Sequence, residues 1–362
     1  MKNLIQEKET ELKKAVEFPS GNPANDESQA KLKTKLAERK FNFHKPPPKP
    51  VACLTLDDKP ISTAGNITNI QAGVKAGKTA VVGAVVGALL RGNRQGGECL
   101  GFNADNPNGL AVVHFDTEQS FYDADQVMRK AMIRAVVDEP PAWLFSYSLA
   151  DVDTLERREA IRLAIAEAGE SCGGVHAVIL DGVADFCADP NDPAEAFALV
   201  AEIHRIAIKH DCPVVTVLHE NPGSETGKTR GHLGSQLERK AETNLRLFKD
   251  GDGITTIYTE RARHCHIPKG EGVCFAWNHQ AGMHTACGNA GEIEAAAKRD
   301  RMTAEAVKVM TQGPLTYSEL VDAITDTLDL KERAAKGRIT SWKNEGVIRK
   351  SDTGKFHLSD DK

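Results

Sequence analysis

Three features are scarce or missing in this sequence: aromatic side chains, excess basic charge and long apolar segments. Phe, Trp and Tyr make up 5% of its 362 residues, which suits a core of Ala, Val, Ile and Leu. The formal net charge is −5, so binding of a polyanion would have to rely on local basic patches. An apolar segment at residues 79–90 is too short to span a bilayer, and no membrane partner is expected.

Paired cysteines are also missing. The eight cysteines are scattered without a disulfide-type framework, and no secretory signal precedes them. The His and Cys residues between 264 and 287 lack the spacing of a structural zinc site, so no metal ligands are expected there. The sequence therefore predicts a cytoplasmic protein with reduced thiols.

The most informative segment has the pattern [AG]-x-x-x-x-G-K-[ST], and it lies between an expected strand and an apolar helix. Small residues let backbone N–H groups surround an anion, and the helix N-terminus adds positive partial charge. Lys78 is expected to reach the β- and γ-phosphates, and the Thr79 hydroxyl to bind Mg²⁺. ATP and Mg²⁺ are thus the expected cofactors. The expected nucleotide-binding residues are Ala72, Gly73, Val74, Lys75, Ala76, Gly77, Lys78 and Thr79.

Between residues 51 and 290 the pattern alternates strand and helix, which predicts an α/β fold with a mostly parallel sheet. Ligands of such sheets lie beyond the carboxyl ends of the strands, where the motifs below are expected. The last strands follow one another through short turns and predict an antiparallel extension. The expected strands are 66–71, 110–115, 143–148, 175–180, 213–218, 243–248, 254–259 and 273–277, and the expected helices are 79–91, 119–136, 152–169 and 192–210.

The chain is expected to have three parts: a polar N-terminal arm or linker (1–50), an ATPase domain (51–288) and a small C-terminal domain (301–362). The arm contains two expected helices, 4–16 and 28–39, before a proline-rich run. It is either a flexible tail or an arm that packs on a neighbouring subunit, and the sequence does not separate these interpretations.

The C-terminal part has the order helix, helix, helix, hairpin, which predicts a small winged helix-turn-helix domain after a linker at 288–300. Its helices are expected at 304–310, 316–328 and 331–345, and its hairpin strands at 347–350 and 355–358. The third helix of such a domain enters the major groove of duplex DNA, and the hairpin contacts its backbone. A winged helix that docks on protein is the alternative. The candidate DNA contacts are Lys336, Arg338, Lys350 and Lys355.

Acidic residues follow two of the expected strands. Asp181 ends the apolar run 178–180 and is the candidate for holding Mg²⁺; the alternative is a carboxylate that caps a turn. Glu118 lies just past the strand before it and is the candidate for positioning or activating water. Here the alternative is that Asp116 or Glu118 caps the next helix, and the two interpretations can hold for different residues.

These motifs resemble the RecA/DnaB superfamily, and within it the RepA-type hexameric replicative helicases of plasmids and mobile elements. The resemblance spans roughly residues 45–285 and rests on three features: the phosphate loop that begins with Ala72, the acidic trio 116–118, and Asp181 followed by Gly182 in place of a second acid. It implies a RecA-like core, with Glu118 as the catalytic carboxylate and ATP hydrolysis at the subunit interfaces of a homohexamer.

The resemblance also implies three further roles. His219, at the end of another strand, would sense the γ-phosphate. The polar loop 220–232 would face a central channel and contact single-stranded DNA through Lys228 and Arg230; the alternative is a mobile surface loop. Arg261 and Arg263, which strand alternation would place on one face, would reach the neighbouring subunit's γ-phosphate; the alternative is a solvated strand end.

The first functional hypothesis is thus a ring-forming DNA helicase or translocase of a plasmid or mobile element. Single-stranded DNA would occupy the channel, and duplex DNA would bind the winged helix. The second hypothesis is a RecA-like regulatory or recombination-mediator ATPase that binds DNA without unwinding it. A weaker third is a nucleotide-dependent scaffold unrelated to DNA.

Overall fold

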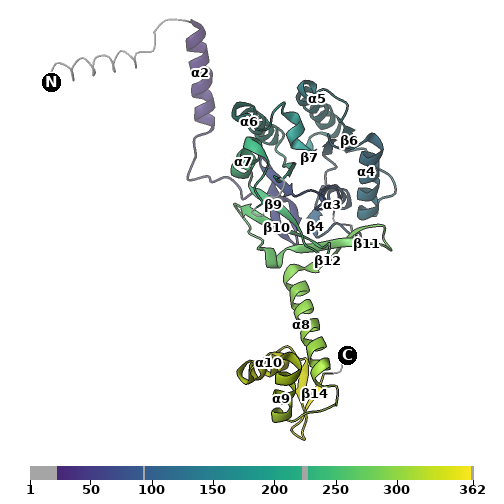
Figure 1. The fold of residues 1–362 in the computed structure, drawn as a ribbon. Helices are drawn as coiled ribbons and strands as arrows, with labels where there is room; N and C mark the ends of the chain where they lie inside the picture. The colour runs from purple at the N-terminus through teal and green to yellow at the C-terminus, as the bar shows by residue number, and fades with distance from the viewer. Residues whose placement is uncertain (1–22, 93, 222–226, 360–362) are drawn as a thin grey trace, which may run out of the picture. The chain divides into compact units, whose positions relative to one another are not determined.

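The computed structural model describes residues 23–92, 94–221 and 227–359, with the side chains of 23–27 left aside. Its contacts divide the chain into two units, residues 1–50 and 51–362. The first unit contains α2 (Pro23–Glu38), whose described residues are exposed, in place of the expected helix 28–39 (Figure 1). The expected helix 4–16 lies outside the described residues.

The second unit is built around a nine-stranded sheet with the order β12-β11-β10-β9-β3-β8-β7-β5-β6 (Figure 1). From β9 to β6 neighbouring strands are parallel, whereas β10, β11 and β12 continue the sheet in antiparallel fashion. The prediction of a mostly parallel sheet with an antiparallel extension is confirmed. The strands are β3 (Ile67–Ala72), β5 (Ala111–Asp116), β6 (Leu144–Ser148), β7 (Val175–Asp181), β8 (Val214–His219), β9 (Thr243–Lys249), β10 (Thr255–Ala262), β11 (Val273–Asn278) and β12 (Met283–Asn289).

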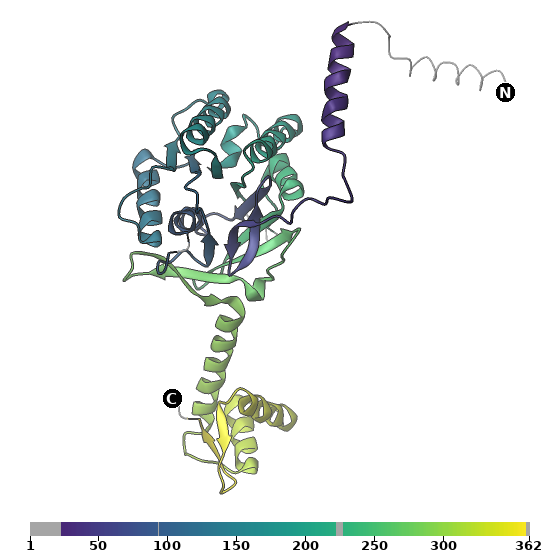
Figure 2. The ribbon, with the colours of Figure 1, turned by 180° about the vertical axis from the view of Figure 1, so that it is seen from behind.

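Helices cover both faces of the parallel part, because its strands alternate apolar side chains to both sides. Side chains of α3 (Lys78–Arg91) and α4 (Phe121–Ala135) join the apolar core on one face. Those of α5 (Thr154–Cys172), α6 (Pro193–His210) and α7 (Gly231–Lys240) join the core on the other. Figure 2 shows the ribbons of these helices, in teal to green, from behind. α7 is unexpected, because the sequence predicted a polar loop through residue 232.

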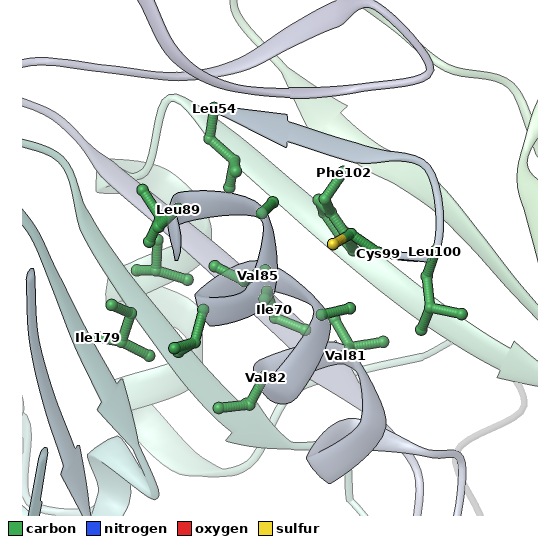
Figure 3. Packing of buried hydrophobic residues seen from close by; sticks show 14 of the residues in the cluster. Leu54, Ile70, Val81, Val82, Val85, Leu89, Cys99, Leu100, Phe102 and Ile179 are labelled. Carbon is green, nitrogen blue, oxygen red and sulfur yellow. The ribbon is translucent and has the colours of Figure 1, made fainter. Parts of the chain in front are cut away.

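α3 is buried on all sides: every residue from Val81 to Leu90 is buried. One side packs on Ile70 and Ile179 of the central sheet, and Leu54 and Phe102 lie on another (Figure 3). The latter belong to a small sheet that was not predicted, of order β2-β1-β4. Its strands are β1 (Ala52–Leu56), β2 (Lys59–Thr63) and β4 (Phe102–Ala104).

The C-terminal part contains three helices and a hairpin in the expected order. One correction concerns the first helix, which starts at Ala290 and takes up the expected linker, because Asn289 and Glu292 form a reciprocal capping box at its start. Trp342 and Ile339 are buried in the core of this part. The elements are α8 (Ala290–Val309), α9 (Tyr317–Leu328), α10 (Glu332–Asn344), β13 (Ile348–Lys350) and β14 (Phe356–Leu358).

Among the described residues, no helix is both long and apolar enough to cross a membrane. All eight cysteines lie in the described part and are free thiols.

Candidate nucleotide-binding site

The phosphate loop connects the end of β3 at Ala72 to the start of α3 at Lys78. Two of its residues, Lys75 (φ 59°) and Gly77 (φ 88°), adopt left-handed backbone conformations that turn the chain tightly. Gly77 is the N-cap of α3 and has no side chain to occupy the first N–H groups of the helix. Those donors and the positive end of the helix dipole together form an anion-binding cradle.

Glycine is required at 77 for a second reason. A Cβ there would lie 2.8 Å from Cε2 of Phe275 on β11, closer than real side chains approach. The antiparallel extension therefore packs directly against the phosphate loop.

Three of the predicted residues meet at the carboxyl edge of the parallel strands. Parallel register places His219, the last residue of β8, beside Ala72. The Lys78 ammonium lies against the His219 imidazole, whose Nε2 is 3.3 Å from Oε2 of Glu118. Burial lowers the pKa of Lys78, and the hydrogen bond with His219 is the largest cause that lowers the pKa of Glu118. Glu118 is thus held as a carboxylate beside the lysine.

The acidic trio divides its roles between a turn and the site. The Asp116 carboxylate accepts from the backbone N–H groups of Glu118 (2.9 Å) and Gln119 (2.8 Å) and from the Gln119 amide (2.6 Å). It therefore stabilises the turn after β5, while Ser120 caps α4. The turn occupies the Asp116 carboxylate. The Glu118 carboxylate takes no part in the turn and interacts with the charge of Lys78.

Asp181 ends β7 directly opposite Asp116 in the parallel register. Its carboxyl is buried, and this burial, followed by the charges of Asp116 and Glu118, raises its pKa to about 7. A buried carboxylate in such surroundings favours a cation at its side.

Magnesium prefers oxygen donors, and both the Asp181 carboxyl and the exposed Thr79 hydroxyl at the start of α3 offer them. The ligand atoms of His114, Asp116 and Asp181 also lie within 4.8 Å of one another. However, Asp116 is already hydrogen-bonded to its turn, and His114 offers nitrogen, which Mg²⁺ disfavours. Thr79 and Asp181 are therefore the residues that fit Mg²⁺.

The structure explains why no second acid follows Asp181. Gly182 has φ 86°, and a Cβ there would lie 2.2 Å from the Thr117 hydroxyl oxygen and 2.9 Å from Cγ of Glu118. The same hydroxyl donates to the backbone oxygens of Asp181 (3.1 Å) and Gly182 (3.0 Å). A side chain at position 182 would thus displace the segment that carries Glu118.

The polar loop after β8 begins and ends in ordered structure. Glu220 and Thr229 form an antiparallel bridge, and the Glu220 carboxylate accepts from buried Arg246 of β9 (2.8 Å). Lys228 and Arg230 are exposed at this stem, while 222–226 lie outside the described residues. The loop thus joins the site through His219 and the sheet through Arg246, a residue that the sequence analysis missed.

Arg261 and Arg263 lie at the other edge of the sheet, away from the phosphate loop of their own chain. β10 runs antiparallel to the β3 direction, so its last residues lie beside the start of β9, at the amino edge of the parallel strands. β10 has an irregularity between Thr259 and Arg261 and ends at Ala262, and the backbone N–H of Arg263 donates to the Glu242 carbonyl at 2.8 Å. Both are exposed, on the edge opposite the phosphate loop.

The candidate DNA contacts of the C-terminal part differ in exposure and in their ion pairs. Lys336, Lys350 and Lys355 are exposed, and Lys336 forms an exposed ion pair with Glu332 of the same helix. Arg338 is half-buried and pairs with Glu305 of α8 at 3.2 Å, so it contributes to packing of the helices. The exposed lysines are therefore better placed than Arg338 to meet an anion.

A cleft of about 590 Å³ extends from the phosphate loop along α4 to the β11–β12 hairpin. Lys78, Glu118 and His219 line one part of it, and Trp277 and His284 line another. Neither aromatic residue was predicted, because the sequence does not show that this hairpin lies beside the phosphate loop.

Together, the mostly parallel sheet and the phosphate loop at its carboxyl edge define a P-loop nucleotide-binding core. A family model described as an AAA domain matches residues 28–225, more than half of the chain, so the protein belongs to this family of P-loop ATPases found in RecA/DnaB-like proteins. No curated protein matches the chain.

Proposed function

We propose that this protein is an ATP-driven, ring-forming DNA helicase or translocase that acts in replication of a plasmid or mobile element. The observation that supports it most is the assembly of Lys78, Glu118 and His219 in contact beside Asp181. This arrangement gives a P-loop ATPase a phosphate-binding lysine, a carboxylate for water and a polar residue that links both. The ATPase domain in this proposal is 51–288.

In the proposed mechanism, the loop N–H groups and Lys78 hold the triphosphate. Thr79 and Asp181 would hold Mg²⁺, which would supply positive charge beside the phosphates. Glu118, ionised at neutral pH, orients and deprotonates the attacking water. The triphosphate competes with His219 for the Lys78 ammonium, so nucleotide binding shifts His219. Because the stem of the polar loop begins at the next residue, this shift changes the loop.

The proposed DNA contacts come from two regions. Lys228 and Arg230 at the loop stem would meet the phosphates of single-stranded DNA in a central channel. Residues 301–362 would act as a winged helix-turn-helix that binds duplex DNA through Lys336 of α10 and through Lys350 and Lys355 of the hairpin, with Arg338 as a weaker candidate. The order of three helices and a hairpin supports this assignment.

The proposed ring completes the active site. Arg261 and Arg263 lie at the sheet edge opposite the phosphate loop of their own chain. They would therefore contact the nucleotide bound to a neighbouring subunit of a homohexamer. An arginine supplied in this way raises the rate of hydrolysis by roughly 10³–10⁵.

Strand displacement tests the proposal directly. The full-length protein is incubated with ATP, Mg²⁺ and a forked DNA duplex, beside the Lys78→Ala variant. We expect displacement by the wild type and none by the variant. DNA-stimulated hydrolysis without displacement would reject unwinding and leave a DNA-dependent motor or the regulatory, recombination-mediator type of ATPase. The oligomeric state of the protein with ATP separates the motor from the regulatory ATPase. A six-membered ring favours the motor, and a dimer or filament favours the regulatory ATPase.

A further inference from the structure

The β11–β12 hairpin carries an aromatic cluster that begins at the phosphate loop. Phe275 contacts the Gly77 position, and its ring centroid lies 5.6 Å from that of His284. Trp277, two residues further along β11, is the register partner of His284, and their rings meet edge to face at 5.3 Å. The cluster thus leads from the triphosphate cradle to an indole ring.

The indole of Trp277 is more exposed than those of the other two tryptophans. Trp277 is 47% exposed, whereas Trp342 is completely buried and Trp143 is partly buried in the core. Exposure of so large an apolar side chain costs free energy that burial against a ligand would recover. Since Trp277 and His284 line the same cleft as Lys78, a ligand bound through its phosphates has this ring within its own site.

The opposite wall of the cleft is polar and comes from α4. Gln126 and Lys130 line the same cleft as the aromatic cluster, and the Gln126 amide donates to the Asp125 carboxylate at 3.3 Å. The buried guanidinium of Arg134 ties the two walls together, because it donates to the backbone oxygen of His284 at 2.8 Å from the last turn of α4. The walls are therefore fixed relative to each other before any ligand binds.

We propose that Trp277 stacks on the nucleobase of the bound nucleotide, with His284 setting the orientation of the indole. Gln126, with a donor and an acceptor on its amide, faces the edge of the base. Stacking on an aromatic side chain contributes about 1–3 kcal/mol per base and is available to every base. Purines offer the larger ring surface, so the site takes purine nucleoside triphosphates in preference to pyrimidine ones. This inference rests on the proposed binding of nucleotide at the phosphate loop.

The test compares two ligands that share the triphosphate and differ in the base. Affinities for ATP and for inorganic tripolyphosphate, each with Mg²⁺, are measured for the wild type, Trp277→Ala and Trp277→Phe by calorimetry. We expect Trp277→Ala to weaken ATP about 5- to 150-fold, which is the stacking contribution expressed as a ratio. Tripolyphosphate should change by less than twofold, and phenylalanine should restore most of the ATP affinity.

The outcomes distinguish failure of the proposed function from failure of the stacking inference. If the wild type binds neither ligand, the proposed function and the stacking inference both fail. If the wild type binds both and Trp277→Ala weakens them equally or not at all, only the stacking inference is overturned.

Tryptophan fluorescence gives an independent readout with a matched control. ATP should quench emission of the wild type and of Trp143→Phe, whose changed side chain lies outside the nucleotide cleft. Trp277→Phe should lose this quenching. Quenching that survives in Trp277→Phe would reject stacking on this indole.

Discussion

The two edges of the central sheet hold their charged side chains in different ways. At the carboxyl edge, Lys78, Glu118 and His219 contact one another beside the buried Asp181. At the amino edge, Arg261 and Arg263 are exposed; one lies 3.6 Å from the Glu238 carboxylate and the other donates to the Lys240 carbonyl at 2.9 Å.

This difference indicates which parts of the proposed site a single chain can supply. At the carboxyl edge the phosphate-binding groups are already assembled. Lys78, Glu118 and His219 lie in contact, and each influences the ionisation of its neighbours. Exposed ion pairs such as that of Arg261 contribute only about 0–1 kcal/mol, so a nearby phosphate can replace their partners at little cost. We therefore propose that the amino edge acts on a second molecule.

The largest expected effect comes from the amino edge. Replacing both Arg261 and Arg263 with alanine should lower kcat for ATP hydrolysis by roughly 10³–10⁵, because charge that develops on the γ-phosphate loses its partner. ATP affinity should change little, since the cradle is intact. Steady-state ATPase assays and nucleotide titrations measure the two quantities.

Subunit mixing decides whether the arginines act between chains. The double variant is mixed with Lys78→Ala protein, which lacks the cradle lysine but keeps both arginines. Activity should reappear, because cradles of one variant meet arginines of the other. A mixture as inactive as its components would show that the two edges do not cooperate across an interface.

The next effect concerns the carboxyl edge. Glu118→Gln should lower kcat by about 10²–10⁴ while ATP still binds, since the amide keeps the shape but not the basicity of the carboxylate. Glu170→Gln, at an exposed position of α5 on the other face of the sheet, is the matched control. Equal activity of the two variants would remove Glu118 from the mechanism.

Asp181 gives a prediction about stability. Its folded pKa, about 7, lies above its unfolded value, so this group's contribution to stability falls as pH rises from about 4 to 7 and stays low above that. Asp181→Asn removes the ionisation and should raise the melting temperature at pH 8 by a few degrees, and by less at pH 5. Thermal unfolding in EDTA without nucleotide measures this. A gain that does not depend on pH would contradict the buried-charge explanation.

The smallest expected effect separates the C-terminal part from both edges. Lys336→Ala should weaken duplex binding several-fold and reduce the slope of log K against log salt by about 0.9, the value for one phosphate contact. Lys209→Ala, an equal charge change on α6, should leave the slope unchanged. Fluorescence anisotropy across a salt series gives both slopes.

Strong local patterns made much of this fold predictable. The apolar run 178–180 and the mostly apolar segment 214–218 predicted their strands within one or two residues, because strands buried on both faces are rich in apolar side chains. The phosphate loop was predictable because few chain segments combine Gly77, Lys78 and Thr79 in that order between a strand and a helix.

Features that depend on distant contacts were not predictable. β12 mixes polar and apolar residues and is ordered by pairing with β11, and α7 is short, with only Leu233, Gly234 and Leu237 buried. The irregularity between Thr259 and Arg261 depends on the pairing of β10 with β9, which residue spacing does not encode. Likewise, the position of Trp277 in the cleft was not predictable, because it depends on the packing of its strand against the phosphate loop.

The central position of β3 determines how short a working fragment of this protein can be. The family match ends at residue 225, before β9, which pairs with β3 along the length of the strand. A protein truncated there would expose the free edge of β3, a site for aggregation, and would remove Phe275 from Gly77. Expression of a soluble, nucleotide-binding piece therefore requires a C-terminal boundary no earlier than Asn289, where β12 ends.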